Sequence, residues 1–221
     1  MEDYAKAIYA LGSYEDGAAV RTNAIAQRLG VTPASASNMV RKLADLGLVT
    51  LAAYHGARLT PTGERVALEV MRHHRLLETY LAETLGMPWE RVHDEAEILE
   101  HSISEDLEQR IATALDHPTR DPHGHPIPTQ ELALSEELTV ALSDVVPGQT
   151  ARFARVSDSN SALLGYLTEQ NILPGVTLTL TAKQPFNGPL FVQIGERQHV
   201  LGDTLARAML MQLLPGDRPQ Q

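Results

Sequence analysis

The stretch of sequence that decides the fold is Thr22-Asn-Ala-Ile-Ala-Gln-Arg-Leu-Gly-Val-Thr-Pro-Ala-Ser-Ala-Ser-Asn-Met-Val-Arg-Lys-Leu-Ala-Asp-Leu-Gly47. Thr22 can cap a first short helix, which ends at Gly30. Thr32 can cap a second helix, with Pro33 at its first position. Two short helices joined by a tight glycine turn predict a helix-turn-helix.

The second of these helices is predicted to have an inner and an outer face. Ala36, Val40 and Leu43 recur at helical spacing and supply the apolar inner face. An asparagine can pair with adenine through two hydrogen bonds, and basic side chains suit phosphates or guanine. The residues expected to contact DNA are Thr32, Ser35, Ser37, Asn38, Arg41 and Lys42 on this helix, with Arg58, Arg21 and Arg28 outside it.

The flanking segments extend this motif. Two β-prone pieces over 48–60 surround His55-Gly56 and predict a hairpin, which after a helix-turn-helix is a wing. A helix over 2–14 precedes the motif, and Thr60 begins a long helix that runs to about Leu85.

A second stretch, Arg91-Val-His-Asp-Glu-Ala-Glu-Ile-Leu-Glu-His101, concentrates metal-ligand chemistry on a predicted helix over about 89–101. Two imidazoles and two carboxylates fall at spacings of four, three and one, so they share one helical face. Such a stripe makes a poor core and a poor solvated face, and it favours a metal-binding surface. The stripe consists of His93, Glu97, Glu100 and His101.

Further candidate ligands lie upstream. His74 and Glu78, four residues apart on the preceding helix, can join His93 in a second site. Asp3 on the first helix is a candidate fourth ligand beside Glu97, because it is a hard ligand on an element expected to pack nearby. Carboxylates and imidazoles without sulfur suit Mn(II), with Fe(II) next, and Zn(II), Co(II) or Cd(II) can substitute in vitro.

Other residues of the same types are expected to be structural. Trp89 and Tyr80 are expected in a core. Solvated or hydrogen-bonded surface positions are expected for His73, His117, His123, His125 and His199.

The C-terminal half has a different pattern. Residues 116–137 are rich in proline and predict a stiff linker or an irregular loop. Beyond about Leu138, short β-prone pieces at 145–148, 151–156, 176–181, 191–194 and 200–201 surround a helix over 161–170, and 202–214 finishes as helix or strand. This predicts a small barrel-like β domain.

Composition and charge set bounds on function. The 221 residues are 43% hydrophobic and can build real cores. The net charge of −10 argues against nonspecific nucleic-acid binding, but residues 21–75 hold eight basic against three acidic side chains (+5) and residues 76–116 hold two against eleven (−9). A nucleic-acid surface beside a cation site is therefore expected.

Membrane insertion, export and thiol chemistry are not expected. The chain has no cysteine, no run of eighteen apolar residues, and no basic, apolar leader at its N-terminus. These features favour a cytoplasmic protein without a membrane partner.

With these motifs in place, the chain resembles the diphtheria-toxin-repressor family of metal-dependent transcriptional regulators in its long, three-part form. The resemblance covers nearly the whole chain. It is carried by Glu2-Asp-Tyr4, the winged helix, Leu59-Thr-Pro-Thr-Gly-Glu64, Met71-Arg-His-His-Arg-Leu-Leu-Glu78, Val92-His-Asp-Glu95 with Glu100-His101, and Pro122-His-Gly-His-Pro-Ile-Pro128.

The resemblance implies a mainly α chain with a small C-terminal β domain. Its parts would be a winged helix-turn-helix over 1–62, a helical metal-binding and dimerisation domain over 63–130, and an SH3-like (FeoA-like) domain over 138–215. A primary metal site would use Asp3, Glu97, Glu100 and His101. An ancillary site would use His74, Glu78 and His93, completed by Asp158 of the C-terminal domain.

The departures from the family's pattern concern the metal. Iron-type members carry sulfur ligands where this chain has Asp3 and Glu97, so its sites look like those of manganese-responsive members. Short manganese members carry another carboxylate where Lys6 stands, so their two-metal site is not expected here.

The chain is expected to be a homodimeric repressor and not an enzyme. Divalent metal is expected to activate this repressor, which then binds a palindromic double-stranded DNA operator of metal-uptake genes. Two alternatives remain open from the residues alone. One is a carboxylate and histidine metalloenzyme, a hydrolase or oxidase, which would need an open coordination position and a substrate pocket. The other is a metal-independent winged-helix regulator whose acidic middle segment only dimerises.

Overall fold

The computed structural model describes residues 1–13, 19–52, 56–135, 137–158 and 160–214. The chain divides into two compact units, residues 1–73 with 128–133, and residues 74–127 with 134–221. The division falls within the long helix α4 (Pro61–Glu83). The predicted fold class, mainly α with a small C-terminal β domain, is confirmed.

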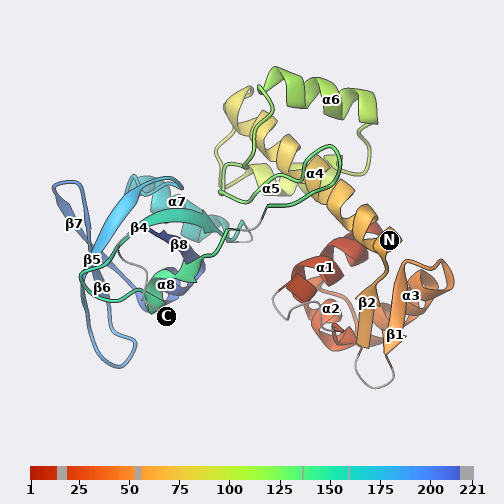
Figure 1. Ribbon diagram of the computed structural model, residues 1–221, viewed down its shortest axis with the longest axis horizontal. Helices are drawn as coiled ribbons and strands as arrows, with labels where there is room; N and C mark the ends of the chain where they lie inside the picture. The colour runs from red at the N-terminus through yellow and green to blue at the C-terminus, as the bar shows by residue number, and fades with distance from the viewer. Residues whose placement is uncertain (14–18, 53–55, 136, 159, 215–221) are drawn as a thin grey trace. The chain divides into compact units, whose positions relative to one another are not determined.

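The first unit contains the helix-turn-helix. Helices α1 (Glu2–Ser13), α2 (Thr22–Arg28) and α3 (Pro33–Asp45) pack together beside the antiparallel strands β1 (Val49–Ala52) and β2 (Gly56–Leu59), as Figure 1 shows. Their shared core includes the buried side chains of Ile8, Ile25, Val40, Leu43 and Val49.

The start signals of these helices were only partly predicted. Thr32 caps α3 as expected, because its Oγ1 accepts a hydrogen bond from the Ser35 backbone N–H at 3.1 Å. Thr22 is not a cap. It is the first residue of α2, and Arg21 occupies the N-cap position without a side-chain hydrogen bond.

The predicted wing is present as the β1–β2 ladder, in which Val49 pairs with Leu59 and Ala52 with Gly56. The turn predicted at His55 lies partly outside the described residues. Gly56 has φ +112, and a Cβ there would lie 2.1 Å from the Val20 carbonyl oxygen, so the hairpin needs glycine where it contacts residue 20.

The second unit begins with a helical layer. The C-terminal part of α4 packs with α5 (Val92–Leu99) and α6 (Glu105–Ala114) around Leu76, Leu77, Ala96 and Ile111. The predicted helix over 89–101 is too long at both ends. Helix α5 ends at Leu99, residues 100–102 form a turn, and Ser104 in an extended conformation then caps α6.

The rest of this unit is a six-stranded antiparallel sheet in the order β3-β8-β4-β5-β6-β7. Its elements are β3 (Val140–Ala141), the 3₁₀ helix η1 (Leu142–Asp144), β4 (Thr150–Val156), α7 (Ser161–Glu169), β5 (Thr177–Lys183), β6 (Leu190–Ile194), β7 (Arg197–Leu201), α8 (Asp203–Ala208) and β8 (Met209–Leu213). Both α7 and α8 bury one face in the sheet core, which contains Phe153, Leu164, Leu180 and Ala206. The strand predicted at 145–148 is absent, and β3 was not predicted.

In the described part of the chain, every helix is too short or too polar to span a bilayer.

Candidate metal centre

The candidate centre is built on α4. His74 and Glu78 lie one turn apart on this helix, and both are buried, with 5% and 0% of their surface exposed. The i, i+4 spacing brings His74 Nε2 to 3.0 Å from Glu78 Oε1. A rigid helix thus presents a nitrogen and an oxygen donor side by side.

Helix α5 adds a third donor. His93 Nδ1 lies 3.1 Å from His74 Nε2 and 3.3 Å from Glu78 Oε1. The two imidazole rings meet edge to face, with centroids 4.9 Å apart. The structure thus brings His93 beside His74 and Glu78, and its role as a ligand stays a prediction.

A fourth donor comes from the segment that follows β4. Asp158 Oδ2 lies 3.5 Å from His93 Nδ1, and its side chain is partly buried. One donor atom from each of His74, Glu78, His93 and Asp158 lies within 4.8 Å of the others. Three segments far apart in the sequence therefore contribute to one cluster.

The spacing of these donors fits a divalent ion. Ligands about 2.1 Å from a metal lie about 3.0 Å apart along an octahedral edge and about 3.4 Å apart along a tetrahedral edge. The donor distances in the cluster are 3.0, 3.1, 3.3 and 3.5 Å. The donor set, two imidazoles and two carboxylates, suits a hard or borderline ion.

The electrostatics of the cluster centre on Glu78. Burial by itself would raise the pKa of the Glu78 carboxyl, but hydrogen bonding to His123, His74 and His93 outweighs it and holds the pKa well below its usual range. Burial by itself would lower the pKa of His93, but the hydrogen bond to Glu78 outweighs the effect of burial and raises this pKa. A buried carboxylate kept ionised among imidazoles is an attractive point for a cation.

The other predicted ligand group lies directly beside this cluster. Glu100, just beyond α5, is buried, and its Oε1 lies 3.5 Å from Nε2 of His101. Glu97 Oε1 lies 3.8 Å from His74 Nδ1 and 4.0 Å from His93 Nε2. Asp3 belongs to α1 in the first unit, so its participation stays a prediction.

Sequence reasoning missed His123, which was expected at the surface. Its side chain is fully buried and stacked on Trp89 at a centroid distance of 5.5 Å, and its Nδ1 lies 3.5 Å from Glu78 Oε2. Burial would lower the pKa of His123, but Glu78 raises it to about 9. The Pro122-His-Gly-His-Pro126 motif was the available signal.

Asp121 holds the loop that delivers this histidine. Its Oδ1 accepts the backbone N–H groups of His123 and His125 at 2.8 and 2.9 Å. Its Oδ2 lies 3.3 Å from His125 Nδ1 and 3.8 Å from Arg75 Nε. Trp89, expected in a core, packs partly buried against the β-domain core and donates from Nε1 to Thr168 Oγ1 at 2.6 Å.

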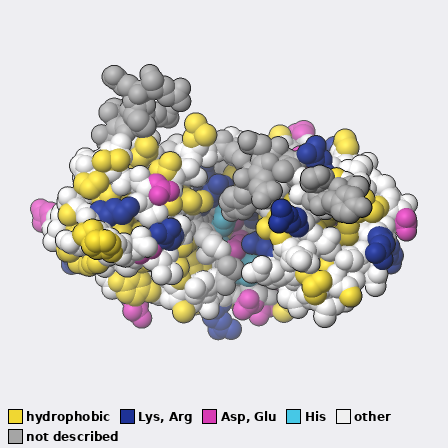
Figure 2. Space-filling view, turned by 90° about the horizontal axis from the view of Figure 1, so that it is seen from below, with side chains coloured by type: hydrophobic (Ala, Val, Ile, Leu, Met, Phe, Trp, Pro, Cys, Tyr) yellow, Lys and Arg dark blue, Asp and Glu magenta, His cyan; other side chains and the backbone are white. Residues whose placement is uncertain are grey.

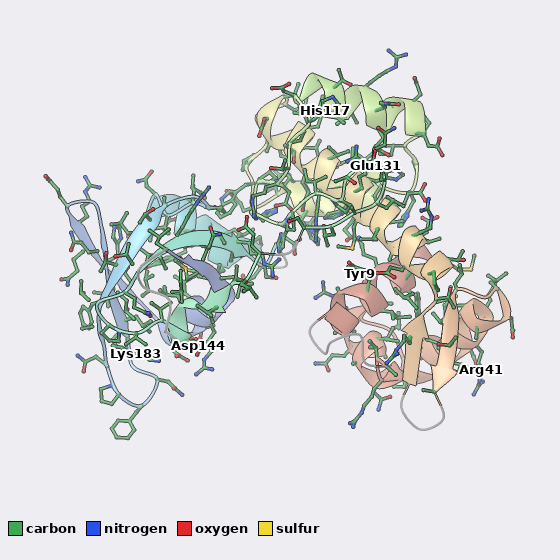
Figure 3. The ribbon with its side chains drawn as sticks, in the orientation of Figure 1. Tyr9, Arg41, His117, Glu131, Asp144 and Lys183 are labelled. Atoms are coloured by element: carbon green, nitrogen blue, oxygen red, sulfur yellow. The ribbon has the colours of Figure 1, made fainter. Side chains whose placement is uncertain are left out.

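The candidate DNA-contacting side chains lie on the outer face of α3 and on β2. Ala36, Val40 and Leu43 form the buried inner face, as predicted. Arg41, labelled in Figure 3, is exposed and donates to Asn38 Oδ1 at 3.4 Å. Ser37 is partly buried, and the other candidates are exposed, namely Thr32, Ser35, Asn38, Arg41, Lys42 and Arg58.

Among the coloured atoms of Figure 2, lysine and arginine side chains lie scattered among hydrophobic and neutral groups. A winged helix, a helical segment with clustered metal-type donors and a small β domain define a class of metal-responsive DNA-binding regulators.

Three family models match consecutive parts of the chain. Residues 1–57 match the iron dependent repressor N-terminal DNA binding domain. Residues 60–129 match the iron dependent repressor metal binding and dimerisation domain, and residues 140–213 match the FeoA domain.

Solved structures agree with these matches. A structure described as a manganese-dependent transcriptional repressor complex with manganese has 36% sequence identity and a TM-score of 0.87, and covers 96% of this chain and 99% of its own. The manganese regulator SloR has 30% identity and a TM-score of 0.78, over 96% and 98% of the two chains. The chain belongs to the diphtheria-toxin-repressor family of metal-dependent transcriptional repressors.

Curated relatives match over a shorter span. The iron-dependent repressor IdeR of Mycobacterium tuberculosis is 40% identical over 127 residues, which is 58% of this chain and 54% of that protein. The diphtheria toxin repressor of Corynebacterium diphtheriae is 38% identical over 148 residues, 66% of this chain and 62% of that protein. These relatives are named as repressors, so the metalloenzyme alternative loses its support.

Proposed function

We propose that the chain is a transcriptional repressor that a divalent metal ion activates for DNA binding. The observation that carries this proposal is the convergence of donors from α4, α5 and the segment after β4 at distances suited to one ion. Membership of a repressor family supplies the link from this cluster to DNA.

We assign one ion to the ancillary cluster, formed by His74, Glu78, His93 and Asp158. We assign a second ion to Glu97, Glu100 and His101, completed by Asp3. The second assignment is supported by the burial of Glu100 and its contact with His101. Histidine and carboxylate side chains would hold both ions, and His123 is placed to support Glu78 from its other oxygen.

Manganese is the proposed physiological metal. The donors are oxygen and imidazole nitrogen, and the chain has no cysteine to bind a softer ion. Structures similar to this chain are described with manganese, zinc and cadmium. Fe(II) remains the second candidate, because iron-dependent repressors are among the relatives.

The regulation we propose is a shift between conformations. If the arrangement that fits DNA also holds the ions better, their binding raises the population of that arrangement. Asp3 on α1, by meeting Glu97 and Glu100, would tie the DNA-binding helices to the metal-binding helices. The DNA-binding domain would then be residues 1–62, and the metal-binding and dimerisation domain would be residues 63–130. The domain that completes the ancillary site would be residues 138–215.

The DNA target would be a palindromic operator of metal-uptake genes, bound by a homodimer in the cytoplasm. On each α3, Asn38 would read adenine, Arg41 and Lys42 would contact guanine or phosphate, and Arg58 in the wing would contact phosphate. The dimer surface we propose includes Ile98, which is 69% exposed on α5, and Leu107, which is 45% exposed on α6. Large exposed apolar side chains favour such burial.

The test is fluorescence anisotropy of the upstream promoter fragment, titrated with protein in parallel with Mn(II), Fe(II), Zn(II) and chelator. Mn(II) is expected to tighten binding by at least about 10-fold relative to chelator. Glu100→Ala with His101→Ala should abolish that response. Asp94→Asn, an exposed carboxylate on the same α5 helix, is the matched control and should keep it. Equal affinity with chelator and with metal would contradict the proposal.

A further inference from the structure

His74 contacts both groups of candidate ligands. Its Nε2 lies 3.0 Å from Glu78 Oε1, in the ancillary cluster. Its Nδ1 lies 2.6 Å from Glu100 Oε2, in the other group. The side chain is only 7% exposed, so neighbouring groups fix the orientation of the ring.

The two ring nitrogens cannot act independently. An imidazole nitrogen that binds a metal ion uses its lone pair, and the ring hydrogen of neutral histidine must then reside on the other nitrogen. With Nε2 of His74 on an ion, Nδ1–H can only donate. Glu100 Oε2, 2.6 Å from Nδ1, is an acceptor within hydrogen-bonding distance, and Glu97 Oε1 lies farther away at 3.8 Å.

The hydrogen bond would position the remaining oxygen of Glu100. Oε1 of that carboxylate already lies 3.5 Å from His101 Nε2, the distance expected between neighbouring ligands of one ion. Outer hydrogen bonds of this kind orient metal ligands, and their loss commonly costs about 10- to 100-fold in metal affinity.

We propose that His74 couples the two metal sites: by ligating the ancillary ion through Nε2, it donates Nδ1–H to Glu100 and prepares that carboxylate for the second ion. His74 is thus a ligand of one site and a positioning residue for the other. The β domain, which supplies Asp158 to the ancillary cluster, would through this ring influence an ion held by residues at the end of α5. This inference rests on the proposed function, because it assumes that both sites bind metal.

The first test uses Asp158→Asn, which changes the ancillary cluster on the Nε2 side of His74. Binding of Mn(II) to the full-length protein is followed by calorimetry and by electron paramagnetic resonance of the free ion. The wild type should take up two ions with positive cooperativity. The variant should bind both ions more weakly, the second by at least about 10-fold.

A matched control is Asp144→Asn. Asp144, labelled in Figure 3, is an exposed carboxylate of η1 in the same β domain. This variant should bind both ions as the wild type does. If Asp158→Asn weakened one ion and left the other at its wild-type affinity, the sites would be independent and the proposal would be overturned.

The second test needs no substitution. Protein labelled with ¹⁵N at histidine is titrated with diamagnetic Zn(II), and the long-range proton–nitrogen correlations of His74 are recorded. The expected spectrum has a metal-bound Nε2 and a protonated Nδ1 whose proton is shifted downfield by its carboxylate acceptor. A metal-bound Nδ1, or a protonated Nε2, would refute the coupling.

The outcomes separate this inference from the proposed function. If the wild type bound no ion, or if its affinity for the operator were the same with and without metal, the proposed function and the coupling would both fail. If metal tightened operator binding while the two ions bound independently, the function would stand and only the role of His74 would fail.

Discussion

Among single residues, Glu78 lies at the centre of the candidate metal cluster. Its carboxylate is fully buried and has His74, His93 and His123 around it. In the described part of the chain no hydrogen bond of good geometry reaches its Oε2. A buried charge is costly unless a cation or a protonated histidine compensates it, and His123, whose pKa Glu78 raises to about 9, is the compensating group in the metal-free protein.

Replacement of the Glu78 carboxylate should therefore lower metal affinity more than replacement of an exposed carboxylate on the same helix. Glu78→Gln removes the negative charge and one donor, and we expect Mn(II) affinity at the ancillary cluster to fall at least about 100-fold. Glu83→Gln, an exposed position on the same α4 helix, is the control. Calorimetric titration gives both affinities, and an unchanged affinity in Glu78→Gln would remove Glu78 from the site.

His123 should control the pH dependence of stability in the metal-free protein. Its pKa, raised to about 9 by Glu78, lies above the ordinary value of 6.5. Because this pKa is higher in the folded than in the unfolded protein, protonated His123 stabilises the folded state, and it does so fully below pH 6.5. The contribution to the free energy of unfolding is on the order of 2–3 kcal/mol, and it is lost as the pH rises through about 9.

Chemical denaturation in chelator at pH 6 to 10 tests this. The wild type should lose stability across the interval, and His123→Gln should lose less. His117→Asn, an exposed histidine at the end of α6 with φ +53, should behave as the wild type. If the free energy of unfolding fell equally with pH in His123→Gln and in the wild type, His123 would not be the group that controls this pH dependence.

Among the helices and strands, those whose ends and faces depend on neighbouring residues in the sequence were predicted from the sequence. Helix α3 followed from the Thr32 cap, Pro33 and the apolar spacing of Ala36, Val40 and Leu43. The pair His74 and Glu78 followed from helical geometry alone. The family resemblance, not the spacing, supplied Asp158.

What sequence could not predict depends on long-range contacts. Strand β3 has two residues, and it is a strand only because it pairs with β8, about 70 positions further on. His123 is buried because its loop is held by Asp121 and by a backbone hydrogen bond from Val156 N–H to the His123 carbonyl at 3.0 Å.

The loop should accordingly depend on Gly124. This residue has φ +88, and a Cβ there would lie 2.0 Å from the Ala154 carbonyl oxygen of β4. Gly124→Ala should destabilise the protein by about 3 kcal/mol, because the clash adds to the cost of the backbone conformation, and it should displace His123 from Glu78.

Gly195→Ala provides the matched control for that measurement. Gly195 has φ +55, and a Cβ there would meet no atom of the described residues within 4 Å, so only the conformational cost of about 1 kcal/mol should appear. Urea denaturation of both variants gives the comparison. Equal losses in the two variants would show that the contact with β4 does not constrain the loop.

At the scale of the whole molecule, charge and function are distributed along the chain. The acidic segment 76–116, with two basic and eleven acidic side chains, holds most of the candidate ligands, and the basic segment 21–75 holds the candidate DNA contacts. Bound divalent cations would offset part of the acidic excess. Metal would then act on the chain both by joining segments and by lowering its net negative charge.

In the proposed function, side chains from three separate segments of the chain hold one divalent ion. Crystals grown with Mn(II) and measured at the manganese absorption edge test it directly. We expect an anomalous peak about 2.2 Å from each of four ligand atoms, which are His74 Nε2, Glu78 Oε1, His93 Nδ1 and an Asp158 oxygen. A fully loaded crystal with no anomalous density among these four side chains would contradict it.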